Sequence, residues 1–367
     1  MRIIKRTICI LSVSLLCITA VGCSKADPPK KTRDSMIVDV KETLEKYLEI
    51  NIHKDFSDKS YGEIYITEPV LYPCDDITWV ENIASRYFYA DKIDLLKKEQ
   101  IEKNTFIKIE EGSEYFYASS SLISFYKDPS FKENACLYYR EPGIDRFFTS
   151  EIDLYFSEQD LDFLSYEEAR KMSDDFMEDI GFHFYRPGCE GYAFDAPGLN
   201  KYKESHQGDI NQMKSVFEEV LGIDFISKWT EKDEFYVFYY PSEINGLQLL
   251  SGEVYPAPWA EVVINKDGIA VADAPYSFEI VQTGKETIIT PLEALEKVKE
   301  MYLNTITAQK IKIYDLDLQY MFTEYIKETE QYRCSPVWKF YVEMRNEDGS
   351  FVTSSVTYDA ITGERLY

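Results

Sequence analysis

The sequence predicts an α+β fold in which antiparallel sheets are each packed by helices. Two capping boxes, at 165–168 and 290–293, each precede a run of apolar residues at helical spacing. Ser or Thr followed three residues later by Glu satisfies the first free amides of a helix. Aromatic-rich runs such as Phe235–Tyr240 and Trp338–Val342 are typical of strands. With 367 residues, 45% apolar and 15% aromatic, the chain is long enough for several packed domains.

The formal net charge of −25 argues against one large class of partner. A surface of this sign repels the phosphates of nucleic acids and anionic lipid head groups. We therefore expect no nucleic-acid partner.

The N-terminus has the organisation of a signal peptide. Residues 1–6 are basic, and the apolar run at 7–18 is too short to cross a bilayer. The sequence Thr19-Ala-Val-Gly-Cys23 then resembles the lipobox of bacterial lipoproteins. That resemblance implies cleavage of residues 1–22, a diacylglycerol anchor and an acyl chain such as palmitate on Cys23, and a place on the extracytoplasmic face of the cell membrane. An uncleaved anchor or an ordinary signal peptide is the alternative, but either leaves the Gly22-Cys23 pair unexplained.

Residues 23–34 are rich in Lys and Pro, which predicts a tether. Residues 35–160 are expected to form an N-terminal α+β domain, because helical and alternating patterns are mixed there. The expected helices are 36–48, a helix after Asp75-Asp76 with Trp79, Ile83 and Tyr87 on one side, and 92–101. The expected strands are 63–67, a hairpin with arms at 106–109 and 115–126, 136–139 and 147–156.

Residues 161–280 contain the first capping box. It opens a helix that Gly181 is placed to end. We expect strands at 182–185, 235–240 and 260–264, with a tight turn at 265–268 leading to a return strand at 269–271. An insert rich in Gly, Pro and Asp carries one expected helix, at 209–221.

Residues 281–367 repeat this order. The second capping box opens a helix, and strands are expected at 311–320 and 338–342, followed by a strand–turn–strand ending around Gly363. Both segments read helix, strand, aromatic strand and closing hairpin. We interpret them as an internal duplication.

The closing sequence Tyr358-Asp-Ala-Ile-Thr-Gly-Glu-Arg-Leu366, together with the capped Glu-Ala helix, resembles a PepSY-type module. Paired modules of this kind are also similar to the extracytoplasmic regions of YycH/YycI-type regulators, and the whole chain is similar to uncharacterised lipoproteins of clostridia-like Gram-positive bacteria. The resemblance implies two PepSY-like repeats after the N-terminal domain. It also implies a role in binding, inhibiting or regulating proteins at the cell surface, with no catalytic residues to transfer.

Four cysteines remain after the lipobox: Cys74, Cys136, Cys189 and Cys334. Their spacing contains no CxxC pair, which disfavours a zinc ribbon or a thioredoxin-like site. Two disulfides with three alternative pairings are compatible with the sequence, although scattered buried thiols are favoured.

No set of residues predicts catalysis, a metal or a cofactor. His53, His183 and His206 lack the HExxH spacing of zinc proteases, and His183 is interpreted as structural because it alternates with two Phe residues. Ser124-x-x-Lys127 matches the SxxK motif of penicillin-binding enzymes, but it lies in a strand-like run that would turn the two side chains to opposite sides.

The aromatic strands give the only candidate ligand-binding residues. Most of these rings are expected in the core, but exposed Tyr and Trp are good contact residues and could line a groove for a peptide or glycan. The candidates are Tyr236, Tyr240, Tyr255, Trp259 and Trp338.

Two functions follow from the sequence. The preferred one is a lipid-anchored, extracytoplasmic protein of non-enzymatic binding or regulatory type that engages a protein or peptide at the cell envelope. The alternative is a cell-envelope hydrolase or solute-binding lipoprotein that uses carboxylates in a cleft.

Overall fold

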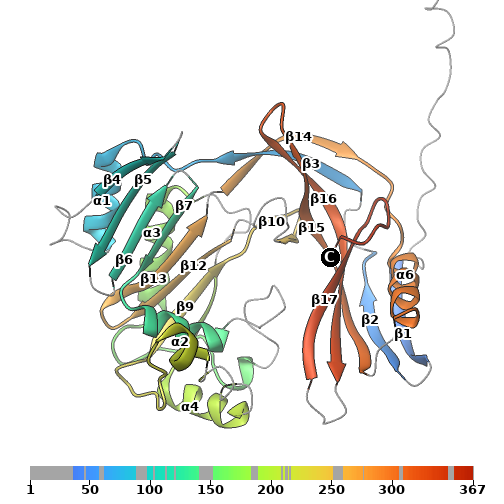
Figure 1. Cartoon of the computed structure of the whole chain (residues 1–367), viewed down its shortest axis with the longest axis horizontal. Coiled ribbons are helices and arrows are strands. Elements are labelled where there is room, and N and C mark those ends of the chain that lie inside the picture. Colours follow the sequence, from blue (N-terminus) through green and yellow to red (C-terminus); the bar gives the residue numbers. More distant parts are fainter. Residues whose placement is uncertain are drawn as a thin grey trace, which may run out of the picture.

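The strands of this computed structural model form two sheets, drawn on either side of Figure 1. The residues that the structure describes are 36–44, 47–57, 62–87, 97–101, 104–111, 114–119, 121–139, 152–182, 189–207, 210, 214, 216–250, 259–275, 277–305, 309–345 and 351–366. Strands outnumber helices and most strand pairs are antiparallel, so the predicted α+β class is confirmed at this level.

Sheet A has nine strands, with the order β1-β2-β15-β16-β3-β14 along its main path. β17 pairs with β16, and β11 pairs with β15 and with the short β10. Two contacts of β15, with β2 and with β11, are parallel. The strands are β1 (Ile37–Leu44), β2 (Leu48–Asp55), β3 (Glu63–Val70), β10 (Glu243–Ile244), β11 (Leu247–Leu250), β14 (Ser277–Lys285), β15 (Lys310–Ile326), β16 (Gln331–Arg345) and β17 (Phe351–Asp359).

Sheet B has eight strands in the order β4-β5-β6-β7-β13-β12-β9-β8, all antiparallel to their neighbours. The strands are β4 (Lys97–Ile101), β5 (Asn104–Glu111), β6 (Glu114–Ser119), β7 (Leu122–Tyr126), β8 (Glu190–Phe194), β9 (Phe235–Tyr240), β12 (Ala260–Asn265) and β13 (Gly268–Pro275).

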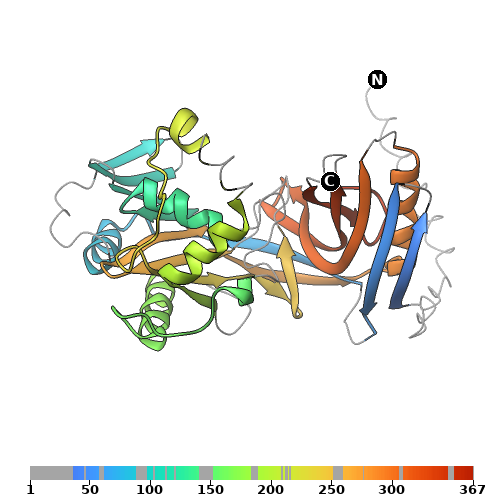
Figure 2. The ribbon, with the colours of Figure 1, turned by 90° about the horizontal axis from the view of Figure 1, so that it is seen from below.

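Helices cover both faces of sheet B. On one face, α1 (Ile77–Tyr87) and α3 (Tyr166–Ile180) pack against Tyr236, Phe238 and their neighbours. On the other, α2 (Pro129–Tyr139) and α4 (Ala196–Ser205) pack against Phe235 and Val237 (Figure 2). Sheet A is packed by α6 (Pro291–Leu303).

Both predicted capping boxes form. In α3, Ser165 and Glu168 exchange hydrogen bonds between side chain and backbone, and Thr290 and Glu293 do the same at the start of α6. Gly181 ends α3 in the left-handed conformation, with φ of 72°, where a residue with a β-carbon would be strained. The helix starts were predictable because each signal lies within four residues.

The expected N-terminal domain at 35–160 is not a structural unit. β1, β2 and β3 belong to sheet A, whereas β4 to β7 belong to sheet B, where β7 pairs with β13. β3 is held in sheet A by β14 and β16. These partners lie far away in the sequence, so local patterns could not reveal them.

The helix expected over 36–48 is wrong, because Ile37–Leu44 form β1 and Leu48 begins β2. The four-residue spacing of Met36, Val40, Leu44 and Leu48 misled the prediction. Positions four apart share a face in a helix, and they also share a face in a strand, where side chains alternate. The burial of Leu48, Ile50 and Ile52 shows the strand period.

Three further expectations fail where the structure describes the residues. Residues 136–139, expected as a strand, end helix α2, which buries Ala135, Tyr138 and Tyr139 on one face. Residues 97–101, expected as helix, form edge strand β4. Residues 152–154 form a 3-10 turn instead of a strand.

Other expectations are tested only in part. Residues 183–185 of the expected strand, and 209, 211–213 and 215 of the helix expected at 209–221, lie outside the described residues. Residues 210, 214 and 216–221 are helical, and Gly222 has φ of 66°. The insert also contains α4, which was missed because its Pro and Gly suggested a loop. Pro197 in fact lies in the first turn, and Asp195 caps the helix.

The four cysteines Cys74, Cys136, Cys189 and Cys334 are all free thiols, and Cys74 and Cys334 are buried. The favoured expectation of scattered buried thiols therefore holds for Cys74 and Cys334, whereas Cys136 and Cys189 are half-buried. Among the residues described above, no helix is long and apolar enough to cross a membrane.

Candidate functional site

The structure places three of the five aromatic candidates in the core. Tyr236 and Tyr240 on β9 and Trp338 on β16 have no exposed surface, so they cannot line an open groove. Trp259 is half-buried at the start of β12, with its ring 6.2 Å from that of Tyr239. Tyr255 and the lipobox Cys23 lie outside the described residues.

The polar ends of the buried rings are used inside the protein. The Tyr236 hydroxyl accepts a hydrogen bond from the Leu161 amide and donates one to the Leu164 carbonyl, each 2.6 Å long. The Trp338 indole N–H donates to the carbonyl of Ile289 at 3.2 Å. Since a buried Tyr or Trp needs such a partner, these rings fasten loops and helices to the sheets.

A different set of aromatic residues reaches the surface at the turn between β15 and β16. The rings of Phe278, Phe322, Tyr332 and Tyr325 form a chain with centroid separations of 5.6, 5.7 and 5.0 Å. Phe278 and Phe322 are buried, Tyr332 is half-buried, and Tyr325 is 44% exposed. The chain of rings therefore leads from the core of sheet A to solvent.

Strand register extends this surface across four strands. Tyr325 on β15 lies opposite Tyr332 on β16, which lies opposite Thr67 on β3, which in turn lies opposite Ile280 on β14. A β-bulge follows Ile280, and Val281 within it is 44% exposed. We call Ile280, Val281, Tyr325 and Tyr332 the tyrosine face.

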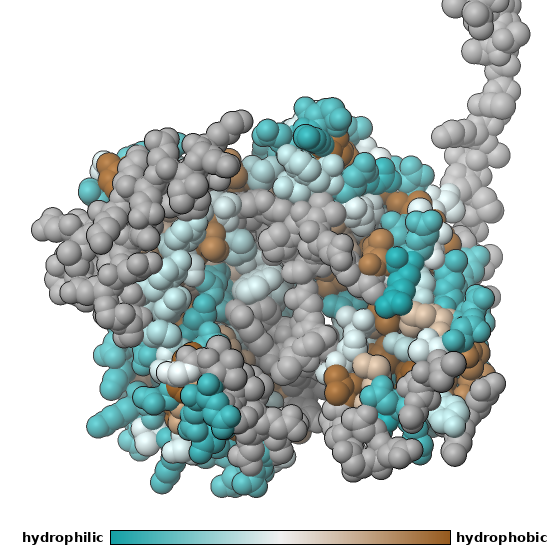
Figure 3. Space-filling view, in the orientation of Figure 1, coloured by the Kyte–Doolittle hydropathy of each residue, from teal (hydrophilic) through white to brown (hydrophobic). Residues whose placement is uncertain are grey.

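Two acidic residues, Glu328 and Glu330, lie beside the tyrosine face in the exposed turn beyond β15. Glu279 and Glu324 precede Ile280 and Tyr325 and so point to the opposite face of the sheet, where Glu324 pairs in register with Arg333. Lys327 is the single basic residue in that turn, 327–330. Figure 3 shows hydrophilic and apolar surface side by side at this end of sheet A. Sequence reasoning missed the face because β3 and β14 join the β15–β16 hairpin from distant parts of the chain.

A row of polar groups crosses the face of sheet B under α2. Ser124, Asp273, Glu261 and Tyr239 lie opposite one another on β7, β13, β12 and β9. Lys132 of α2 forms an ion pair with Asp273 at 3.1 Å, and both side chains are 18% exposed. Burial lowers the pKa of Lys132, but attraction to Asp273 and Glu261 outweighs it and the pKa is raised.

The polar groups of this row bond to one another and to residues of α2. Ser124 donates a hydrogen bond to Asp273, and the Tyr139 hydroxyl lies 3.5 Å from the fully buried Glu261. Ser124 lies on β7, as the rejection of the SxxK motif required, and Lys127 instead bonds to the carbonyl of Asp267. The carboxylates hold α2 on the sheet instead of opening into a cleft.

The histidines that can be placed have local contacts. His206 ends α4, where its ring stacks on Tyr202 with centroids 4.1 Å apart, and His53 faces Asp39 in the β1–β2 hairpin at 3.4 Å. His183 lies outside the described residues. Within the described ranges, no three His, Cys, Asp or Glu side chains are grouped to hold a metal ion.

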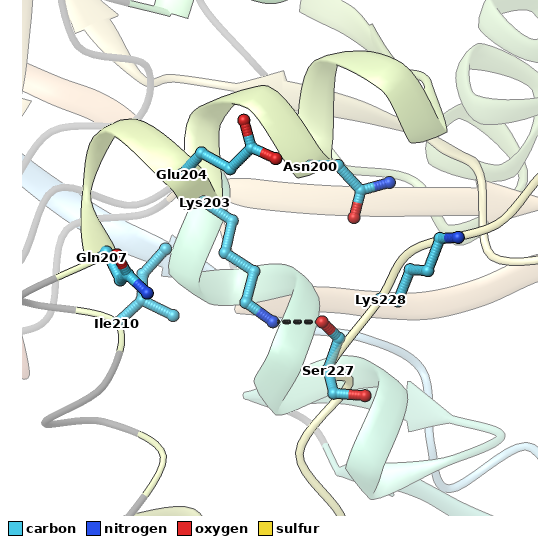
Figure 4. A pocket seen from close by; sticks show the side chains of 7 residues that line it. All are labelled: Asn200, Lys203, Glu204, Gln207, Ile210, Ser227 and Lys228. Carbon is cyan, nitrogen blue, oxygen red and sulfur yellow. Dashed lines mark hydrogen bonds between the residues drawn. The ribbon is translucent and has the colours of Figure 1, made fainter.

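A pocket of about 400 Å³ lies between α4 and the extended segment 226–228 (Figure 4), and we call it the α4 pocket. Lys203 reaches from α4 across to this segment and donates hydrogen bonds to the carbonyls of Ile226 and Ser227, at 3.2 and 2.5 Å. Its ammonium group also lies 4.7 Å from the ring centroid of Phe225. The lining consists of Asn200, Lys203, Glu204, Gln207, Ile210, Ser227 and Lys228.

Two asparagines fix the wall of the α4 pocket. Asn200 of α4 receives a hydrogen bond from the Trp229 amide at 3.1 Å and donates one to the Trp229 carbonyl at 2.9 Å. Asn134 of α2 receives one from the Ile226 amide and donates one to the Asp224 carbonyl. Each Asn side chain thus bonds to backbone groups of the segment 224–229 that a neighbouring strand would otherwise bond. These bonds hold the wall of the α4 pocket in place.

The fold is similar to that of an uncharacterized protein from Eubacterium rectale, whose crystal structure is known. The TM-score is 0.58 at 16% sequence identity, and the alignment covers 91% of this chain and 97% of that chain. Similarity at this low identity shows the fold alone. No protein-family model and no curated protein matches the sequence.

Proposed function

We propose that this chain is a lipid-anchored, extracytoplasmic protein of binding or regulatory type that engages a protein or peptide partner at the cell envelope. The lipobox at Cys23 supports the anchor and the location. The observation that carries the partner is the tyrosine face, where a chain of packed rings ends in the exposed Tyr325.

The tyrosine face has the features of a protein contact surface. Tyr is enriched in interfaces because it offers a large area and a polar tip, and it loses little conformational entropy. Tyr325 is held in place by Tyr332, which packs on the buried Phe322. A ring held in this way loses little further freedom when a partner covers it.

The charge around the face indicates the kind of partner. Glu328 and Glu330, in the turn beside Tyr325, would repel an acidic protein and attract a basic one. Lys or Arg side chains of the partner could pair with this rim and lie over the exposed Tyr ring. We therefore propose a partner whose contact region is basic, and association that weakens as the salt concentration rises.

Crosslinking on intact cells, followed by mass spectrometry, tests this proposal. The wild-type protein should recover a reproducible partner, and Tyr325→Ser should reduce its recovery strongly. Tyr47→Ser is the matched control, because Tyr47 is also 44% exposed but lies in the turn between β1 and β2. No reproducible partner, or an equal effect of both substitutions, would contradict the proposal.

We also propose that the two capped helices open two PepSY-like repeats, at 161–280 and 281–367. In support, α3 is followed in sheet B by the neighbouring strands β8, β9, β12 and β13, and α6 is followed in sheet A by β15, β16 and β17. The short strands β10 and β11, between β9 and β12 in the chain, instead pair in sheet A. Superposing the two halves of an experimental structure tests this idea. Opposite directions of the helix relative to its strands would rule out a common repeat.

A further inference from the structure

The α4 pocket contains a positive charge that its surroundings leave without a counter-ion. Over the described part of the chain, no carboxylate forms an ion pair with Lys203, whose ammonium group contacts two carbonyl oxygens and one ring. Glu204 is its neighbour on α4, but Figure 4 shows the carboxylate directed away from the Lys203 ammonium group. Burial lowers the pKa of Lys203, and the nearby Lys214 lowers it further. An anion in the pocket would relieve both effects.

Further hydrogen-bond donors line the α4 pocket. A Lys ammonium group has three donors, and Lys203 uses two of them on the carbonyls of Ile226 and Ser227. Lys228, on the facing segment, and Gln207, just after α4, also line the pocket, and Figure 4 shows the Lys228 ammonium group reaching away from that of Lys203. Ile210, which is 5% exposed, supplies an apolar part of the lining. Donors for an anion thus lie beside a place for an aliphatic group.

We infer that the α4 pocket binds a ligand in which a carboxylate lies next to an aliphatic side chain. The volume of about 400 Å³ is within the range of small-molecule sites. The segment 224–229 is already fixed by Asn134 and Asn200, so binding requires little ordering of the protein. The site is separate from the tyrosine face and does not depend on the function proposed for it.

Two sources share this chemistry, namely a free amino acid and the C-terminal residue of a peptide. A free amino acid carries an ammonium group beside its carboxylate, and this group would meet Lys203 and Lys228. Like charges at short range are unfavourable, so the pocket favours an acylated nitrogen. The peptide C-terminus is therefore the expected source.

Calorimetry with three probes tests the ligand class, using the full-length protein in detergent. N-acetyl-leucine should bind, and N-acetyl-leucinamide, which has the same shape without the charge, should bind at least about five-fold more weakly. Leucine should bind more weakly than N-acetyl-leucine if the source is a peptide, and at least as tightly if it is a free amino acid. Equal binding of N-acetyl-leucine and its amide, or no binding of N-acetyl-leucine, overturns the inference.

Substitutions locate the site. Lys228→Ala should lower the affinity for N-acetyl-leucine by roughly 2- to 5-fold, the range expected for an exposed ion pair. Lys232→Ala is the control, because Lys232 is exposed nearby but does not line the pocket. Both variants keep Lys203, whose loss could disturb the segment that it holds. An equal loss of affinity in both variants would show that the probe is attracted to the lysines of the surface in general. That result would overturn the assignment of the α4 pocket as the binding site. Tyr325→Ser should leave this affinity unchanged, which separates the test from that of the partner.

Discussion

Asn200 and Trp229 are joined by two hydrogen bonds through one side-chain amide, which receives the Trp229 N–H and donates to the Trp229 carbonyl. Trp229 is itself buried, and its indole N–H donates to the Tyr138 hydroxyl at 2.8 Å. The Asn200 amide therefore connects helix α4 to the aromatic cluster under sheet B. It also holds one wall of the α4 pocket.

Asn200→Ala should destabilise the protein by about 2–4 kcal/mol, because it leaves a backbone N–H and a C=O without partners beside a buried ring. Chemical denaturation followed by Trp fluorescence measures the change. Asn51→Ala is the control, since Asn51 is exposed on β2 and should change stability by less than about 0.5 kcal/mol. Equal stabilities of the two variants would show that water replaces the Asn200 amide without cost.

The ion pair between Lys132 and Asp273 leads to a second prediction. Asp273→Asn should cost about 2–4 kcal/mol, because Lys132 keeps its partly buried position but loses its nearest carboxylate. In this variant the effect of burial is no longer outweighed, so the pKa of Lys132 should fall.

A double variant separates charge from packing at this site. Lys132→Met with Asp273→Asn should recover part of the lost stability, since neither member of the pair is then charged, although the buried Glu261 remains. The exposed pair of Lys171 and Asp175 on α3 is the comparison, and Lys171→Ala should cost no more than about 0.5 kcal/mol. A double variant no more stable than Asp273→Asn alone would contradict the electrostatic account.

A feature of this fold could be predicted from the sequence when the residues that determine it lie close together in the chain. The capping boxes at Ser165 and Thr290 were readable because their partners lie three residues away. The division of residues 35–160 between two sheets was not, because β3 is positioned by β14 and β16. Pairing over such distances is set by the whole fold, and no local pattern encodes it.

The candidate site shows the same limit. β9 reads Phe-Tyr-Val-Phe-Tyr-Tyr without a polar interruption, and such a run is typical of a strand buried on both faces. That signal was present and could have removed Tyr236 and Tyr240 from the candidate list. The exposure of Tyr325 could not be read in this way. Its partner Tyr332 lies in the same hairpin, but β3, which pairs with β16, and β14, which pairs with β3, come from other parts of the chain.

Alkaline pH should destabilise the protein. Burial raises the pKa of Cys74 and of Tyr138 to about 12, from ordinary values of 9.0 and 10.0. Between the ordinary and the raised values the unfolded chain has released these protons and the folded chain has kept them. Stability is therefore complete below about pH 9 and falls as the pH rises to about 12, by about 1.4 kcal/mol per pH unit for each fully buried group.

Denaturation curves measured from pH 8 to alkaline pH test this dependence. Burial also raises the pKa of Tyr302 to about 12, so Tyr302→Phe should make the decline less steep. Tyr325→Phe is the control, because Tyr325 is exposed and should leave the slope unchanged. A stability that stays constant up to pH 11 would show that the buried thiols and phenols ionise as readily in the folded protein as in the unfolded chain.

The proposed membrane anchor can be tested by replacing Cys23 alone. Cys23→Ala removes the thiol to which diacylglycerol would be joined, so the protein should no longer incorporate a labelled fatty acid and should either remain unprocessed or leave the membrane fraction. One buried acyl chain binds a membrane only weakly, whereas two or more anchor a protein stably, so the loss should be nearly complete. Cys17→Ala is the matched control, because it changes a cysteine six residues earlier and leaves the lipobox intact. Fatty-acid labelling that persists in Cys23→Ala would rule out this anchor. The protein and its basic partner would then have to associate without being confined to the membrane surface.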